Sequence, residues 1–431
     1  MNALIPLGDL SLLRRSAIPI VTACLVLAAC TDASEPTAPL SSTASPNQAE
    51  GRGFAQRLYA IGTSISAGTC SDGNVASCQQ NSWVAQVIRA MHREPLLPLI
   101  AAPGCKAPLA APLITFVRTS GESVATPESS IQCALNEEGV SLPTQILAIP
   151  GAWTHEALHQ TPAARSDPYG AQLYRRILPL NESQVSALEK VNPKFVTVEL
   201  GANDIMSVHS GIVIPGVTYA PFATWSATYD SVLDRVGAVT KQALLVGLGR
   251  DISKLNSLRT GSELWADRAA FLSAFNVEVS SNCDGNPNLI VVPILVPGAV
   301  ANGLGRLQAG LGPFTLSCLE GAFNVQDRIL TPAEVTAVNA QFDAMTNHIE
   351  SQATARGYAY MDLEVLFAIP KGAFSVVAVM TTGTPYGPNI SLDGLHPSAA
   401  GQTLIAQAAL QAIDARYNIG FDALSSISRR P

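Results

Sequence analysis

The chain has 431 residues, of which 47% are hydrophobic and only 14% charged. That length allows roughly two to three domains with a large buried core. The formal net charge of −7, without long runs of lysine or arginine, argues against a nucleic-acid partner. Nothing repeats at a fixed period, which excludes a solenoid or a propeller.

Residues 1–29 have the pattern of an export signal. Arg14 and Arg15 precede an apolar run that ends in Leu-Ala-Ala-Cys at Cys30, and the run is too short for a permanent membrane helix. This ending resembles a bacterial lipoprotein signal, which implies that Cys30 is lipidated and anchors an exported protein to a membrane. An ordinary cleaved secretory signal is the alternative. Residues 30–53, rich in Ser, Thr, Ala and Pro, predict a flexible tether.

Between residues 54 and 420, apolar runs alternate with amphipathic patterns. The apolar runs predict buried strands at 57–62, 145–151, 194–201, 242–249, 288–296 and 358–367. The amphipathic patterns predict helices at 82–94, 184–192, 224–242, 332–357 and 399–417. This alternation predicts an α/β fold, a three-layer sandwich with a central parallel sheet and helices on both faces. Residues 421–431 are expected to form a C-terminal tail.

Three apolar segments rich in Gly and Pro interrupt this pattern, at 206–222, 296–316 and 369–389. Each follows a predicted strand, so we expect them to be long loop insertions that overhang the site. Irregular cover over the core is the alternative.

The cysteine count agrees with export. Besides Cys24 and Cys30 the chain has six cysteines, which allow fifteen pairings. Because short loops favour neighbours, we expect the pairs Cys70–Cys78, Cys105–Cys133 and Cys283–Cys318. Buried free thiols are the alternative, which an oxidising compartment disfavours.

Ser64 directly follows the first predicted strand, in Gly-Thr-Ser-Ile-Ser. The site of a parallel α/β sheet lies beyond the carboxyl ends of its strands, and Ser64 is expected there. A serine becomes a good nucleophile only when a base takes its proton. His396 is the best candidate, because Asp393 precedes it by three residues in Asp-Gly-Leu-His and is close enough to orient the ring.

Two other strand ends offer hydrogen-bond donors. Asn203 lies in Gly-Ala-Asn-Asp after the strand predicted at 194–201, and Gly151 ends the strand predicted at 145–151. A side-chain amide and a backbone N–H in these places can stabilise a developing oxyanion. A plain turn is the alternative for each.

These patches, in this order, resemble the motifs of the SGNH (GDSL-type) hydrolase family of esterases, lipases and deacetylases. The resemblance spans residues 57–417 and implies a flavodoxin-like fold. It implies Ser64 as the nucleophile, His396 as the general base and Asp393 as the acid that orients it. It also implies an oxyanion hole made by the N–H groups of Ser64 and Gly151 and the amide of Asn203.

The chain departs from the family pattern at Thr63, where the family usually has Asp. That residue is not the acid of the triad, so the reaction type is retained. Ser66 also replaces the last glycine of G-x-S-x-G, which argues against the nucleophile elbow of α/β hydrolases.

A rival motif lies in Thr-His-Glu-Ala-Leu-His-Gln. His155, Glu156 and His159 fit H-E-x-x-H, which on a helix presents two zinc ligands and a glutamate base, with Glu182 as a possible third ligand. Pro162 would end such a helix almost at once. A secreted zinc metalloprotease is therefore the alternative function.

A catalytically silent binding domain is a third alternative, and the intact Ser64, Asp393 and His396 argue against it. The hydrolase interpretation needs no metal or organic cofactor. It predicts a monomer that acts on a small-molecule or lipid ester.

Overall fold

The computed structural model describes residues 56–321, 325–367 and 370–419. The predicted signal peptide, Cys30 and the tether to residue 53 lie outside the described residues, as does the predicted tail at 421–431.

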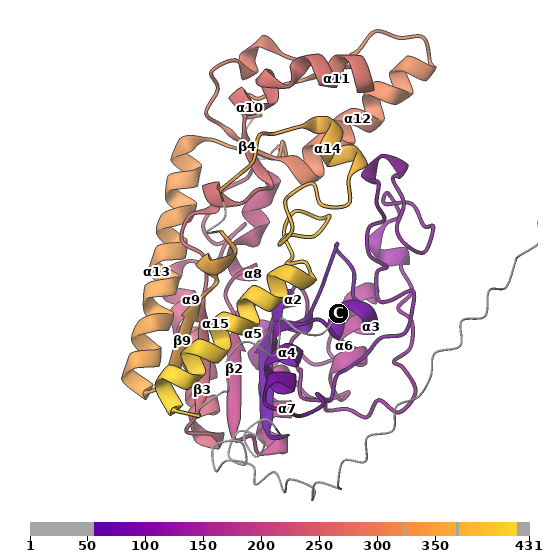
Figure 1. Ribbon diagram of the computed structural model, residues 1–431. Helices are drawn as coiled ribbons and strands as arrows, with labels where there is room; N and C mark the ends of the chain where they lie inside the picture. Colours follow the sequence, from indigo (N-terminus) through magenta and orange to yellow (C-terminus); the bar gives the residue numbers. More distant parts are fainter. Residues whose placement is uncertain (1–55, 322–324, 368–369, 420–431) are drawn as a thin grey trace, which may run out of the picture. The chain divides into compact units, whose positions relative to one another are not determined.

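A parallel sheet in the order β1-β2-β3-β9 forms the centre of the described chain. Its strands are β1 (Leu58–Gly62), β2 (Phe195–Glu199), β3 (Ala243–Gly247) and β9 (Ala359–Asp362). Nearly all of their residues are buried, as continuous apolar runs require of strands covered on both faces. The predicted α/β fold with a central parallel sheet is confirmed (Figure 1).

Helices cover both faces of this sheet. On one face Leu244 and Val246 pack among side chains of α4 (Trp83–Ala90) and α15 (Ala399–Tyr417). On the other face Leu245 belongs to a core with five helices: α5 (Thr154–His159), α6 (Pro168–Ile177), α7 (Gln184–Val191), α9 (Phe222–Val239) and α13 (Pro332–Arg356). Alternate residues of one strand therefore serve two cores, which is the three-layer arrangement predicted from the sequence.

Shorter helices occupy the connections. The α-helical ones are α2 (Ser64–Ala67), α3 (Ala76–Gln79) and α8 (Asn203–Met206). Single 3-10 turns are η1 (Leu113–Thr115), η2 (Glu128–Ser130), η3 (Ser207–Ser210), η4 (Ile252–Lys254), η5 (Ser281–Cys283) and η6 (Leu363–Leu366). Both α2 and α8 directly follow strands of the central sheet, so they mark its carboxyl edge.

The strand predicted at 145–151 is not formed as such. The segment lies along β1 with one parallel bridge, Ala60–Ile146, and backbone hydrogen bonds such as Leu147 N–H to the Ala60 carbonyl (2.8 Å). Pro143 precedes it and Pro150 lies within it, and neither has an N–H for a ladder. The segment still runs beside the sheet, so Gly151 lies at the carboxyl edge of the sheet.

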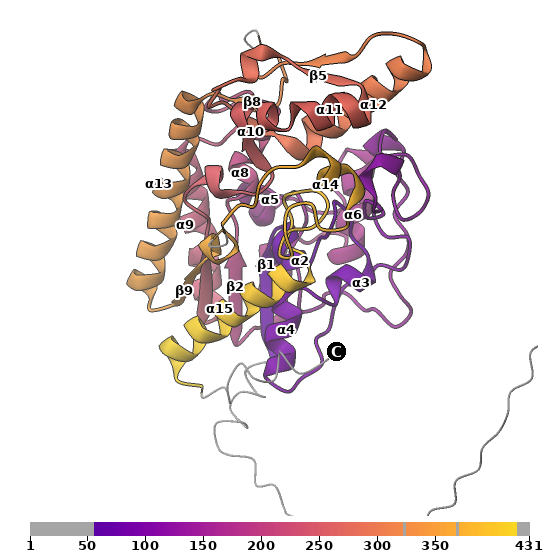
Figure 2. The same ribbon diagram turned by 45° about the horizontal axis from the view of Figure 1, so that its top comes forward.

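We call residues 258–321 and 325–330 the insertion. Many of its apolar side chains belong to a hydrophobic cluster that it shares with Leu113 and with residues 376–392. Its elements are β4 (Leu258–Thr260), α10 (Gly261–Ala266), α11 (Arg268–Phe275), β5 (Val277–Val279), β6 (Leu289–Val291), α12 (Val292–Gln308), β7 (Phe314–Leu316) and β8 (Ile329–Leu330). Strands β4, β6 and β8 pair antiparallel, and β5 pairs with β7. With α14 (Val376–Thr381), the insertion lies beyond the carboxyl ends of the central strands (Figures 1 and 2).

Two predictions for this region are wrong. Residues 288–296 give only the short β6, outside the central sheet, before α12 begins. Pro293 favours that start, because the N–H groups in the first turn of a helix make no hydrogen bond within the helix, and proline lacks one. Segment 296–316 is mostly α12 and not a loop. Its Gly303 serves close packing, since a Cβ there would meet the backbone carbonyl of Phe275.

All three expected disulfides are present: Cys70–Cys78, Cys105–Cys133 and Cys283–Cys318. Disulfides are typical of extracellular or periplasmic proteins. Among the helices of the described residues, none has the length and apolar character needed to span a membrane.

Candidate active site

Ser64 begins α2, immediately after β1, and its side chain is buried. Glu199, the last residue of β2, stabilises this turn through hydrogen bonds. Its carboxyl group accepts hydrogen bonds from the Thr63 hydroxyl (2.7 Å), the Thr63 N–H (3.0 Å) and the Ser66 N–H (3.2 Å). Burial raises the pKa of Glu199, and these hydrogen bonds oppose that effect.

This contact gives Thr63 a structural role. The hydroxyl at this position donates to a completely buried carboxyl group, which forms no ion pair with the described residues. A buried carboxyl needs such donors, because an unpaired polar group in the interior is costly. Thr63 thus helps to fix the turn that carries Ser64.

Asp393 and His396 form a compact pair in the turn before α15. The His396 Nδ1–H donates to Asp393 Oδ2 at 2.7 Å, and the N–H groups of Leu395 and His396 each donate to Asp393 Oδ1 at 2.9 Å. The Ser391 N–H donates to the His396 carbonyl (2.8 Å) and closes the turn. The carboxylate therefore fixes both the backbone of the turn and the orientation of the ring.

The electrostatics of this pair suit a base. Burial would raise the pKa of Asp393, but the His396 ring and the N–H donors lower it to about 2. Burial likewise would lower the pKa of His396, but the Asp393 carboxylate raises it above its ordinary value. At neutral pH Asp393 is therefore an anion that stabilises the imidazolium form of His396.

This turn is attached to the segment that follows Ser64. The Ser71 N–H donates to the Ser391 hydroxyl (2.8 Å), and the Leu392 N–H donates to the Ser71 hydroxyl (3.3 Å). The Asp72 N–H donates to Asp393 Oδ2. These contacts bring the two ends of the domain to one edge of the sheet. Among the described residues, Ser64 and His396 are not joined by a hydrogen bond.

Asp72 is in turn fixed by two cations. Its carboxylate pairs with the Lys106 ammonium (2.9 Å) and with the guanidinium of Arg118 (2.8 Å), which is only 6% exposed. Sequence analysis missed these residues, because only contacts between distant segments bring them to the Asp393 turn.

Gly151 and Asn203 also meet at this edge. The Asn203 amide donates to the carbonyl of Ala152 (3.0 Å), which leaves its second N–H available. Gly151 is exposed and has φ +79°, a left-handed conformation that favours glycine.

Asp204 ties these two segments together. Its carboxyl group accepts hydrogen bonds from the Thr154 hydroxyl (2.8 Å) and N–H (3.0 Å). Burial raises the pKa of Asp204 to about 6. Asp204 belongs to the Gly-Ala-Asn-Asp motif, but the sequence alone indicated no role for it.

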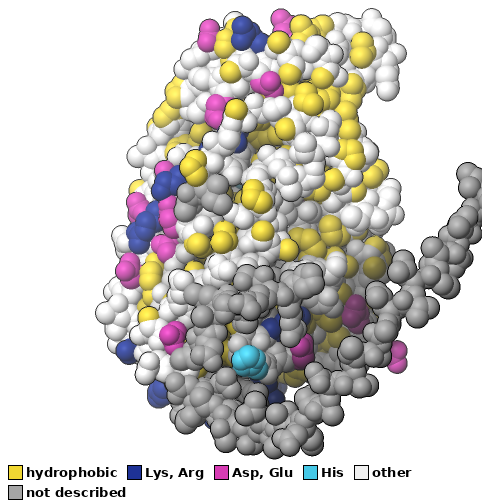
Figure 3. All heavy atoms as spheres, in the orientation of Figure 1, with side chains coloured by type: hydrophobic (Ala, Val, Ile, Leu, Met, Phe, Trp, Pro, Cys, Tyr) yellow, Lys and Arg dark blue, Asp and Glu magenta, His cyan; other side chains and the backbone are white. Residues whose placement is uncertain are grey.

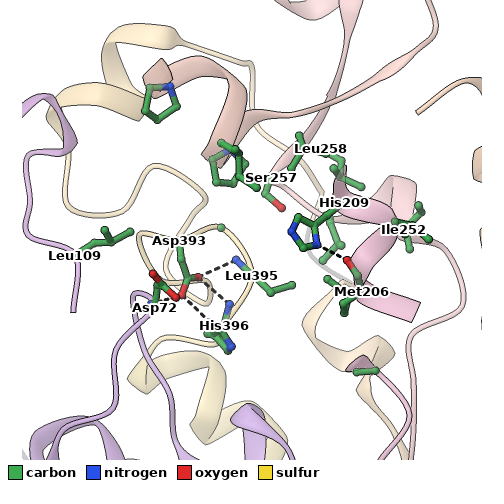
Figure 4. A pocket seen from close by; sticks show the side chains of 18 of the residues that line it. Asp72, Leu109, Met206, His209, Ile252, Ser257, Leu258, Asp393, Leu395 and His396 are labelled. Atoms are coloured by element: carbon green, nitrogen blue, oxygen red, sulfur yellow. Dashed lines mark hydrogen bonds and ion pairs between the residues drawn. The ribbon is translucent and has the colours of Figure 1, made fainter. Parts of the chain in front are cut away.

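A cavity of about 790 Å³ borders these residues, and Asp393 and His396 line it (Figure 4). Ser64 and Asn203 do not line it, but their chain neighbours Ile65 and Ala202 do. Most of the wall is apolar and comes from the insertion and from the segments that follow β2, β3 and β9. Examples are Met206, Val208, Leu248, Leu258, Val291, Pro297, Leu363 and Phe367.

Two exposed apolar side chains, Ile294 and Leu395, also line the cavity, at 41% and 40% exposure. On the face shown in Figure 3, charged side chains gather on the α13 side, whereas hydrophobic side chains are spread over the region of α11, α12 and α14.

The H-E-x-x-H motif forms the short helix α5, on which His155 and His159 are exposed. Glu156 accepts a hydrogen bond from the Trp153 N–H (2.9 Å) and pairs with Arg165. Glu182, the possible third ligand, instead contacts Lys190 and Ser186. Within the described ranges, no group of three His, Cys, Asp or Glu side chains is arranged to hold a metal ion.

Comparison with known proteins gives only remote similarity. No protein-family model matches the chain, and neither does any curated protein sequence. Solved structures that align with it include an α/β hydrolase enzyme from the metagenome of Lake Arreo (14% identity, TM-score 0.33, 83% of this chain and 94% of that one). An acetylxylan esterase from Geobacillus stearothermophilus aligns at 12% identity and TM-score 0.33, over 83% and 93%.

An extracellular lipase from Streptomyces rimosus aligns at 15% identity and TM-score 0.31, over 83% of this chain and 98% of that one. At such scores these likenesses carry no argument about activity. The function proposed below rests on the residues of the site.

Proposed function

We propose that this protein is a serine hydrolase of carboxylic esters, with Ser64 as nucleophile, His396 as general base and Asp393 as its orienting acid. The observation that carries the proposal is the Asp393–His396 pair, joined at 2.7 Å on the wall of an apolar cavity. The attachment of its turn to Ser71 and Asp72, a few residues after Ser64, supports a common site.

The proposed reaction has two halves. The Ser64 oxygen attacks the ester carbonyl carbon while its proton passes to His396 Nε2, and Asp393 stabilises the resulting imidazolium. The carbon–oxygen bond to the alcohol then breaks, and the alcohol takes the proton from His396. Water, deprotonated by His396, attacks the acyl-enzyme and releases the acid, and Ser64 regains its proton.

Three donors are proposed for the oxyanion: the N–H groups of Ser64 and Gly151 and the free N–H of the Asn203 amide. The Asn203–Ala152 and Asp204–Thr154 hydrogen bonds support this role, because they fix the two donor segments relative to each other. Loss of one such donor lowers kcat by about 10²–10³-fold in hydrolases of this kind.

The apolar lining of the cavity favours a substrate with an apolar acyl group, which would bind in this cavity. Its volume is within the range of ligand sites, ~300–1,000 Å³. Its apolar side chains would bury methylenes, each worth about 0.8 kcal/mol.

Ser64→Ala tests the proposal. We expect this variant to lose hydrolysis of p-nitrophenyl esters and labelling by a fluorophosphonate, because no other hydroxyl is assigned as the nucleophile. Ser66→Ala is the matched control, since Ser66 is a second buried serine of the same short helix, two residues away. A Ser64→Ala enzyme that keeps its activity, or a label found on another residue, would contradict the proposal.

We also propose that Cys30 anchors the exported protein to a membrane through lipid. The support is the Leu-Ala-Ala-Cys ending of the apolar N-terminal run and the tether sequence that follows it. The three disulfides agree with a location outside the cytosol.

A further inference from the structure

Most charged groups of the cavity wall are engaged by other protein groups. Asp72 is paired with Lys106 and Arg118. Asp251 accepts hydrogen bonds from the Ser253 N–H (2.9 Å) and the Asn339 amide (3.0 Å). Asp72, Lys106 and Arg118 thus satisfy one another, whereas Asp251 uses only Oδ1 in these hydrogen bonds.

The polar atoms of the wall that make no hydrogen bond with the described residues include His396 Nε2, His209 Nε2 and Ser257 Oγ. The first is the atom that accepts the proton in the proposed reaction. The other two have no part in it, although both side chains line the same cavity. Sequence analysis gave no function to either residue.

His209 has a defined protonation pattern. Its Nδ1 contacts the carbonyl oxygen of Met206, and a carbonyl can only accept, so Nδ1 carries the hydrogen. His209 is exposed, but partial desolvation of its ring and the nearby Arg328 cation lower its pKa, against the opposing effect of the Met206 carbonyl. The lowered pKa favours the neutral ring at pH 7. Nε2 is then a lone-pair acceptor on the cavity wall.

Ser257 is buried, and its backbone carbonyl accepts a hydrogen bond from the Val292 N–H (3.0 Å). A Cβ added at Gly394 would lie 2.7 Å from the Ser257 Cβ, so Ser257 packs directly against the turn that carries Asp393. In Figure 4, Ser257 and His209 lie on the same side of Asp393, and Ser257 is the nearer of the two to the Asp393 turn. Ser257 is therefore close to the proposed reaction centre and shares a wall with His209.

Apolar side chains line the same cavity, among them Ile252, Leu255 and Leu258. Water can satisfy His209 and Ser257 while the cavity is unoccupied by ligand. A plain hydrocarbon chain that displaced this water would leave both atoms unpaired, which is unfavourable. A chain that carried a hydroxyl group there could donate to His209 Nε2 and pair with the Ser257 hydroxyl.

We propose that His209 and Ser257 bind a hydroxyl group on the acyl part of the substrate, so that the preferred substrates are esters of hydroxylated fatty acids. This inference rests on the proposed ester hydrolase function and adds a specificity site to it.

The test uses pairs of p-nitrophenyl esters with the same acyl chain length, one plain and one hydroxylated, with the hydroxyl placed at several positions along the chain. The leaving group is constant, so the ratio of kcat/KM within a pair reports the hydroxyl alone. At the best position we expect the wild type to favour the hydroxylated ester by about tenfold, as one or two hydrogen bonds provide.

His209→Phe keeps a flat ring but removes the acceptor, and Ser257→Ala keeps the Cβ that packs on Gly394. Each variant is expected to bring the ratio close to one. His159→Phe, the same change at an exposed histidine of α5 outside the cavity wall, should keep the wild-type ratio.

Two results would overturn the hydroxyl site: a wild-type ratio of one or less at every position, or a preference that both variants retain. In either case the esters are still hydrolysed and the proposed function stands. Failure of the proposed function is different, because the wild type would then hydrolyse neither member of a pair and would take no phosphonate label.

Discussion

At the scale of single residues, the environment of His396 determines the pH at which the proposed base works. Only the neutral ring can take the Ser64 proton, and the Asp393 carboxylate raises the pKa of His396 despite its burial. We therefore expect kcat/KM to rise with pH up to an apparent pKa above 6.5, the ordinary value for histidine. The dependence of kcat/KM on pH, measured with a p-nitrophenyl ester, gives this apparent pKa.

Asp393→Asn is the comparison for this profile. It keeps the shape of the side chain but removes the charge, so the apparent pKa should fall and kcat should drop by as much as about 10⁴-fold. An unchanged apparent pKa in this variant would contradict the assignment of the titrating group.

Thr63 offers a second test at this scale. Thr63→Val removes the hydroxyl that donates to Glu199 at 2.7 Å and leaves a carboxyl oxygen without that partner in the interior. We expect the free energy of unfolding to fall by ~1–3 kcal/mol, measured by urea denaturation. Thr336→Val is the control, because Thr336 is exposed on α13 and its hydroxyl bonds only the Pro332 carbonyl. Equal effects in the two variants would show that Glu199 does not depend on Thr63.

At the scale of secondary structure elements, α12 can be used to change the cavity. Gly298 lines the cavity, and a Cβ added there would meet no atom within 4 Å. Gly298→Phe should narrow the cavity and lower the ratio of kcat/KM for a decanoyl over an acetyl ester about tenfold or more, because one excluded methylene costs ~1–3 kcal/mol.

Gly305→Phe, at an exposed site of the same helix that does not line the cavity, controls for general effects on α12. If Gly298→Phe leaves the chain-length preference as it is in Gly305→Phe, the acyl group does not occupy this cavity.

The elements also show what the sequence could predict. The helices expected at 332–357 and 399–417 match α13 and α15 within one residue at each end, because clear cap residues mark their starts. The strand expected at 288–296 is wrong, because a continuous apolar run fits a buried strand and a buried helix equally well.

The same distinction holds for the site. The contact of Asp393 with His396 is local, three residues along the chain, so the sequence could indicate it. The placement of Arg118, Glu199 and Ser257 depends on contacts between distant segments, and no pattern in the sequence reports these.

At the scale of the whole molecule, the proposed anchor predicts where the protein is found. We expect the full chain to fractionate with membranes and Cys30→Ser to be released in soluble form, because only Cys30 is proposed to carry lipid. Hydrolysis of a soluble ester by the released variant checks that the fold is intact. A Cys30→Ser protein that still fractionates with membranes would contradict the lipid anchor.

The hydrogen bonds between Ser71–Asp72 and the 391–393 turn join residues separated by about 320 positions. The proposed general base can therefore join the Ser64 segment only after residues 391–396 have been synthesised and have docked on Ser71 and Asp72. If the proposed triad holds, a nascent chain that carries Ser64 but not yet His396 is expected to hydrolyse no ester.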